Sequence, residues 1–164
     1  MSPVAPADPG GMDRGRTLHG AMDGLLALAE GPVAAAFRDA TSGGYEPTVS
    51  RYRPFKPNAP AIWHERRPSR VAPVDLGWDR TELYLAVTLA VFHRDGQTEG
   101  EDLEKALDAA QTIYRVASHT RGALNWAHRV EITNLEPPTP TAINAVPLLT
   151  GGIVLRVELD APRQ

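Results

Sequence analysis

Five histidines are the side chains of this sequence best suited to acid–base or metal chemistry. They are His19, His64, His93, His119 and His128. No two of them have the i, i+4 spacing of a helical zinc pair, and no His-x-His triplet occurs. His93 lies shortly before Asp95, but a catalytic dyad would also need a positioned partner and a pocket. We therefore interpret the histidines as surface residues and predict neither a catalytic histidine nor a metal site.

Other residue types that could do chemistry are equally uninformative. The pair Gly151-Gly152 is not followed by the Lys-Ser/Thr and helix start of a phosphate-binding loop, so we predict a bulge or a tight strand entry. The chain has no cysteine, which excludes disulfides, thiolate ligands and a thiol nucleophile. Paired carboxylates occur only near residue 101, where helix capping explains them. The sequence therefore predicts a protein that is not an enzyme and has no cofactor.

Opposite charges are concentrated in two segments. Residues 51–70 contain arginines and a lysine with one acid, and residues 95–108 contain acids with one base. Three interpretations remain open: two solvated faces, a head-to-tail contact between copies of the chain, or contact of the basic segment with DNA. The residues that would form an interface or line a lumen are Ile62, Trp63, Arg66, Arg67, Arg70, Glu101 and Asp102. The net charge of −3 gives no overall attraction to nucleic acid or to an anionic membrane.

Two helices must position these segments, because apolar residues recur every three or four positions in two places. The first helix covers residues 17–40. It contains Gly31-Pro32, where we expect a kink or a break because proline lacks the backbone N–H. The second begins at a capping-box pattern, Thr98 to Glu101, and continues to residue 118.

The clearest strand is the strict alternation over residues 81–92, in which the large apolar residues are odd-numbered. Residues 71–78 are expected to pair with this strand as a hairpin. Further strands are predicted at 129–135 and 153–159, where apolar and polar residues also alternate.

Prolines mark two segments as irregular. Six prolines over residues 45–73 predict an edge strand plus a long loop, because proline cannot donate to a sheet. Four prolines over residues 136–152 predict a second long connection, too long for a tight hairpin.

The length of 164 residues fits one domain. We predict a flexible N-terminal arm at 1–16, one α+β domain at 17–160 and a short tail at 161–164. The domain should contain a mixed or antiparallel sheet of about four to five strands with two main helices on one face. No segment approaches the ~18–20 continuous apolar residues of a membrane span, so we expect no membrane contact.

This order of elements resembles the tail terminator (tail completion) proteins of long-tailed bacteriophages. The matching features are an amphipathic helix at 17–40, the Pro-Ala-Ile-Trp run at 60–63, the alternating strand at 82–91, an acidic-capped helix at 101–118 and the Gly-aliphatic strand at 150–159. The resemblance covers residues 17–160 and is one of pattern, since no single motif is diagnostic.

The resemblance implies a structural virion protein, assembled in the host cytoplasm and located at the tail–head junction. It would form a hexameric ring that caps the tail tube, contacts the major tail tube protein and the head–tail connector protein, and lets DNA pass through its lumen. The family has no catalytic residues to carry over. Two alternatives remain: a head–tail adaptor or other neck protein, and a bacterial domain that binds a small ligand.

Overall fold

The computed structural model describes residues 17–75, 77–94, 97–119 and 129–162. The arm predicted at 1–16 and the last two residues of the predicted tail lie outside these ranges. Ala161 and Pro162 belong to a strand, so the ordered domain extends past the predicted boundary at residue 160.

The first helix runs as one continuous element through α2 (Leu18–Leu28), the π-helical turn η1 (Ala29–Val33) and α3 (Ala34–Ala40). Thr17 caps its start, because its Oγ1 accepts the backbone N–H of Gly20 at 3.0 Å. Pro32 lies inside the π-turn. The wider turn accommodates the missing N–H and the proline ring without ending the helix. The break or kink expected at Gly31-Pro32 is therefore a local widening.

Five strands form one mixed sheet in the order β1-β2-β3-β5-β4. Their bounds are β1 (Thr48–Val49), β2 (Ala61–Asp75), β3 (Trp78–Phe92), β4 (Arg129–Ile143) and β5 (Val146–Pro162). β1 pairs with β2 in parallel, and every other pair is antiparallel. The prediction that 71–78 pairs with the alternating strand as a hairpin is confirmed, with Val71 opposite Thr81.

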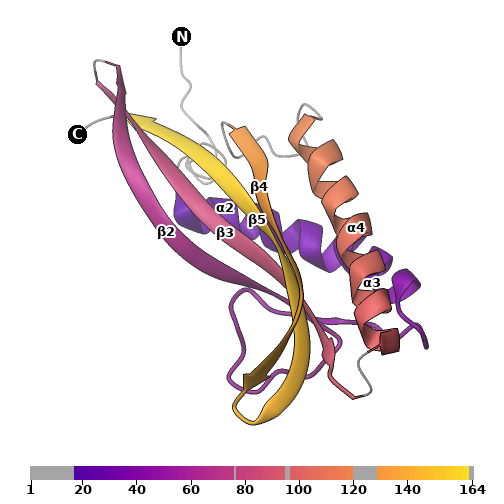
Figure 1. Ribbon diagram of the computed structural model, residues 1–164. Coiled ribbons are helices and arrows are strands. Elements are labelled where there is room, and N and C mark those ends of the chain that lie inside the picture. The colour runs from indigo at the N-terminus through magenta and orange to yellow at the C-terminus, as the bar shows by residue number, and fades with distance from the viewer. Residues whose placement is uncertain (1–16, 76, 95–96, 120–128, 163–164) are drawn as a thin grey trace.

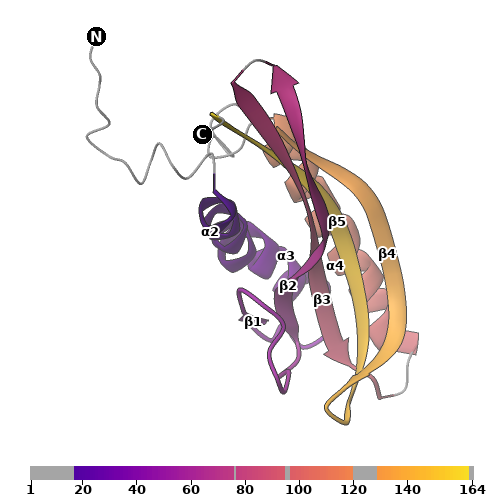
Figure 2. The ribbon, with the colours of Figure 1, turned by 90° about the vertical axis from the view of Figure 1, so that its left-hand side faces the viewer.

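The helices cover one face of this sheet, as predicted for an α+β domain. The long helix α4 (Gln97–His119) contacts β3, β4 and β5, and it packs against α3. Figures 1 and 2 show the curved strands with the helices on one side. Because α4 begins at Gln97, Thr98 lies within its first turn and is not the N-cap that the capping-box pattern predicts.

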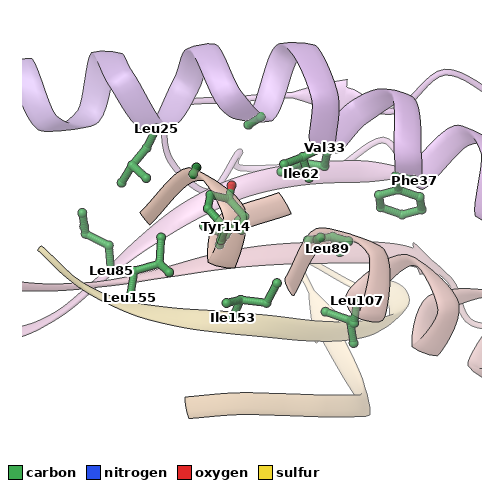
Figure 3. Packing of buried hydrophobic residues seen from close by; sticks show 14 of the residues in the cluster. Leu25, Val33, Phe37, Ile62, Leu85, Leu89, Leu107, Tyr114, Ile153 and Leu155 are labelled. Carbon is green, nitrogen blue, oxygen red and sulfur yellow. The ribbon is translucent and has the colours of Figure 1, made fainter. Parts of the chain in front are cut away.

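The core lies between the helices and the odd-numbered residues of β3. Leu85, Val87 and Leu89 are buried together with Leu107 of α4 and Leu155 of β5. Figure 3 shows Leu85, Leu89, Leu107 and Leu155 together with Leu25, Val33 and Phe37 of the first helix in the space between the sheet and the helices. Val157 and the half-buried Ile113 belong to the same core.

The proline-rich segment 45–73 contains the predicted edge strand, β1, and a loop from 50 to 60, but β2 then continues from Ala61 to Asp75 as a long strand. The long connection predicted at 136–152 is wrong, because β4 and β5 occupy it except for the turn at 144 and 145. β2 continues through Pro68 and Pro73, with register shifts between Arg67 and Arg70 and between Pro73 and Asp75. β4 contains Pro137 and Pro138 where its register shifts between Glu136 and Thr139. Beyond the short β1, both strands are edges in the described sheet, and edges tolerate residues without an N–H donor.

Candidate functional site

An ion-pair network covers much of the sheet face that the helices leave open. Strand alternation places the even-numbered residues of β3 and β5 on this face. Glu158 lies 3.6 Å from Arg80 and 3.6 Å from Arg156, and Arg156 also pairs with Glu131 of β4. The side chain of Glu158 is only 6% exposed, so the nearby arginines, and not water, stabilise its negative charge.

A second group of this network lies at the β2 edge. Arg70 donates to both carboxylate oxygens of Glu82, with Nε 2.7 Å from Oε2 and NH2 3.2 Å from Oε1. The hydrogen bond from Arg70 is the main reason that the pKa of Glu82 is lowered. Tyr84 also donates to Glu82. Arginines and carboxylates thus neutralise each other across this face.

Trp63 and Arg67 line a small cavity of about 320 Å³ on the same face. The indole N–H of Trp63 donates to Glu65 Oε1 at 2.8 Å, and Arg67 pairs with Glu65 and Glu136 at 3.2 and 3.0 Å. Trp63 itself is fully buried, in a cluster with Ala61, Ala90 and Leu148. The charged side chains that line this cavity are therefore paired with one another.

The structure separates the residues of the predicted basic segment. Ile62 and Trp63 are 0% exposed, so their apolar area is already buried within the subunit and cannot also be supplied to an interface. Arg67 and Arg70 are neutralised by Glu136 and Glu82, as described above. Arg66 points the other way, since it lies opposite Leu85 on the helix-covered face, where its own side chain is exposed. Residues 61–70 are a strand with two faces, not one basic loop.

The acidic segment, in contrast, does present a continuous surface on α4. Glu101, Glu104 and Asp108 are exposed at spacings of three and four residues, with the exposed Lys105 among them. No ion pair within the described ranges involves these three acids. Asp102 is used internally, because its Oδ2 accepts the backbone N–H of Ser42 at 2.9 Å. We call Glu101, Glu104, Lys105 and Asp108 the α4 stripe.

A loop between β1 and β2 carries exposed aromatic side chains that the sequence did not reveal, beside basic side chains that belong to the predicted basic segment 51–70. Phe55 is 83% exposed and Tyr52 is 49% exposed. Arg53 and Lys56 are exposed between and beside them, and neither has an ion pair among the described residues. We call residues 52–56 the aromatic loop. The signal that could have revealed it is the alternation of basic and aromatic residues from Arg51 to Lys56.

Two anchors hold the aromatic loop in place. At its base, Arg51 NH1 lies 2.6 Å from Asp23 Oδ1, and Arg51 NH2 donates to the carbonyl of His19 at 2.9 Å. At its tip, the Asn144 side chain donates to the carbonyl of Phe55. An exposed aromatic ring on an anchored loop loses less conformational freedom on binding than one on a free loop.

A cavity of about 700 Å³ lies between the end of α3, the start of α4 and the end of β3. Its lining mixes charged groups, among them Glu46, Arg94 and Asp102, with Tyr45 and Phe92. Small-ligand sites are mostly apolar, with a few placed polar groups. This cavity has the volume of such a site but a more polar lining.

The histidines within the described ranges do not form a site. His64 is 1% exposed, so its expected surface position is wrong. Burial lowers its pKa, and the backbone of Ser50 and Arg51 beside the ring opposes part of that shift. His93 is half-buried at the end of β3. Over the described parts of the chain, no three His, Asp or Glu side chains gather as metal ligands.

None of the helices described here has both the length and the apolar composition needed to cross a bilayer. Compared with known proteins, the chain matches no family model and no curated protein sequence.

Proposed function

We propose that this protein is a structural subunit of a phage virion, which forms a ring that caps the tail tube and joins it to the head connector. The order of elements expected from its sequence resembles that of tail terminators. The single observation that carries the proposal is the presence of two unlike exposed surfaces, the aromatic loop and the α4 stripe, on one small domain. Ring assembly from identical subunits needs two different surfaces that complement each other.

The placement of these surfaces supports a head-to-tail contact. The aromatic loop follows β1 and reaches the β4–β5 turn, where Asn144 holds the carbonyl of Phe55, whereas the α4 stripe lies on the exposed side of a helix that packs over β4 and β5. Figures 1 and 2 show the loop beside β1, at the end of the sheet where β4 turns into β5. The paired charges of the helix-free face do not favour a DNA-binding lumen there, because its arginines are already neutralised.

The proposal is tested by assembly onto tubes. A gene for a major tail tube protein next to this one would identify the cognate tube. Purified tubes mixed with this protein should carry a ring at one end in electron micrographs and should stop elongating. Tubes that keep growing, with no density added at their ends, would contradict the proposed function. A head–tail adaptor would instead bind the connector and leave tube growth unchanged.

A second function, binding of a small ligand, is favoured by the cavity of about 700 Å³. In that case the protein should remain a monomer or dimer, and a cognate ligand should raise its melting temperature. Filling the cavity, for example by Ser42→Trp, should abolish the rise. Ring formation on tubes that is unaffected by Ser42→Trp would favour the structural role.

A further inference from the structure

We infer that the aromatic loop of one copy docks on the α4 stripe of the next, which names the subunit interface and rests on the proposed function. The two surfaces match group by group. Arg53 and Lys56 are cations without an ion pair in the described parts of the chain. The acids of the α4 stripe likewise have no ion pair there. The aromatic ring of Phe55 is suited to the one cation of the stripe, Lys105, through a cation–π contact.

The apolar part of this contact comes from groups that are exposed in the subunit. Phe55 and Tyr52 present aromatic rings to solvent, whereas Ile62 and Trp63 do not. Aromatic side chains are frequent hot spots of interfaces because they bury a large area with few rotatable bonds. The charges around them set orientation more than strength. This assignment replaces the earlier expectation that Ile62, Trp63 and the arginines of β2 form the contact.

The contact cannot be made within one subunit, which is why a second copy is the occupant. The carbonyl of Phe55 is held by Asn144 at the β4–β5 turn, and Arg51 fixes the base of the loop on α2. α4 is held in place by α3 and by the sheet. Both surfaces are therefore fixed on the subunit, and each is left without a complement among the described residues.

Charge reversal tests the pairing. The loop variant carries Arg53→Glu with Lys56→Glu, and the stripe variant carries Glu101→Lys with Glu104→Lys. Each alone should associate roughly tenfold more weakly than wild type by sedimentation, because like charges then face each other. An equimolar mixture of the two variants should recover association, since each reversed loop then meets a reversed stripe. If association does not recover in the mixture, the proposed pairing is wrong.

The matched control changes the same number of charges elsewhere. Arg66→Glu with Arg94→Glu alters two exposed arginines outside the aromatic loop and the α4 stripe, and neither has an ion pair in the described ranges. This control should associate like wild type. If it weakens association as much as the loop variant does, net charge and not the aromatic loop governs assembly, and the inference fails.

Disulfide trapping tests the contact between the aromatic loop and the α4 stripe independently of the proposed function. The chain has no cysteine, so Phe55→Cys mixed with Lys105→Cys should give a disulfide-linked dimer with oxidised glutathione. Phe55→Cys mixed with Val71→Cys, on an exposed site of β2, should not. A trapped dimer whose parent protein never caps tubes would preserve the contact and refute the proposed function. Normal capping of tubes without a trapped dimer would support the proposed function and refute the contact. Loss of DNA binding in the loop variant, with association unchanged, would assign the loop to nucleic acid instead.

Discussion

Arg67 of β2 and Glu136 of β4 form an ion pair, NH2 to Oε1 3.0 Å, although β3 and β5 lie between their strands. The pair can span the sheet because a glycine lies under it. Gly152 is the register partner of Glu136, and a Cβ at that position would stand 3.0 Å from Glu136 Oε1. Gly152 thus leaves room for the Glu136 carboxylate to extend over β5 toward Arg67.

The glycine pair gives the first prediction. Gly151→Ala should lower the free energy of unfolding by ~1–3 kcal/mol, because its Cβ would lie 3.0 Å from the backbone oxygen of Glu136 and 2.5 Å from Leu107 Cδ1. Gly152→Ala should cost less, about 1 kcal/mol or below, since the Glu136 side chain can move away. Urea denaturation of both variants measures the difference. Equal losses would show that β5 shifts to accept either methyl group.

The alternating strand gives the second prediction. Leu89→Ala or Leu155→Ala should cost ~2–5 kcal/mol, because each side chain is fully buried between the sheet and the helices. Val116→Ala is the control, since Val116 is 57% exposed, and it should change stability by no more than ~0.5 kcal/mol. Thermal or urea unfolding provides the measurement. If Leu89→Ala is as stable as wild type, the odd-numbered side chains of β3 do not point into the core.

The turn between β4 and β5 gives the third prediction. Asn144 and Ala145 have φ values of 49° and 65°, the left-handed conformation of a two-residue hairpin turn. Alanine is strained there and glycine is not, so Ala145→Gly should raise the free energy of unfolding by ~0.5–1 kcal/mol. Ala142→Gly, within β4, should instead lower it by a similar amount, about 0.5–1 kcal/mol. If both substitutions destabilise, the turn has a different backbone conformation.

His64 gives the fourth prediction, which concerns pH. Because burial lowers the pKa of His64 in the folded state, the unfolded chain takes up a proton first as the pH falls below ~6.5. The stabilising effect of the neutral ring is therefore complete above this pH and is lost progressively below it. Between pH 7 and pH 5, wild type should lose on the order of 1–2 kcal/mol more than His64→Leu.

Urea unfolding curves recorded at several pH values check the His64 prediction. His93→Gln serves as the control, because that side chain is only half-buried. The control should keep the pH dependence of wild type. A parallel decline of wild type and His64→Leu would show that other groups account for the acid sensitivity.

The sequence by itself determined the elements that obey a simple period. The alternation from Leu83 to Val91 placed the core face of β3, and the three- and four-residue spacing placed the buried face of α4. These patterns are local, since burying one face of a strand or helix requires apolar residues at a fixed spacing. For the same reason the α+β class and the two helices on one face could be predicted.

Only the tertiary structure decided how the proline-rich segments and the charges are used. Proline excludes a central strand but not an edge, and whether 61–75 and 136–143 are edges depends on the strand order. Likewise, Arg66 and Arg67 are adjacent in sequence yet lie on opposite faces of β2, and Arg67 pairs with Glu136 from a strand three places away in the sheet order. Pairing of charges depends on distance in space, which the strand order sets, so the sequence placed Arg53 and Lys56 in a basic segment but did not show which of its charges stay unpaired.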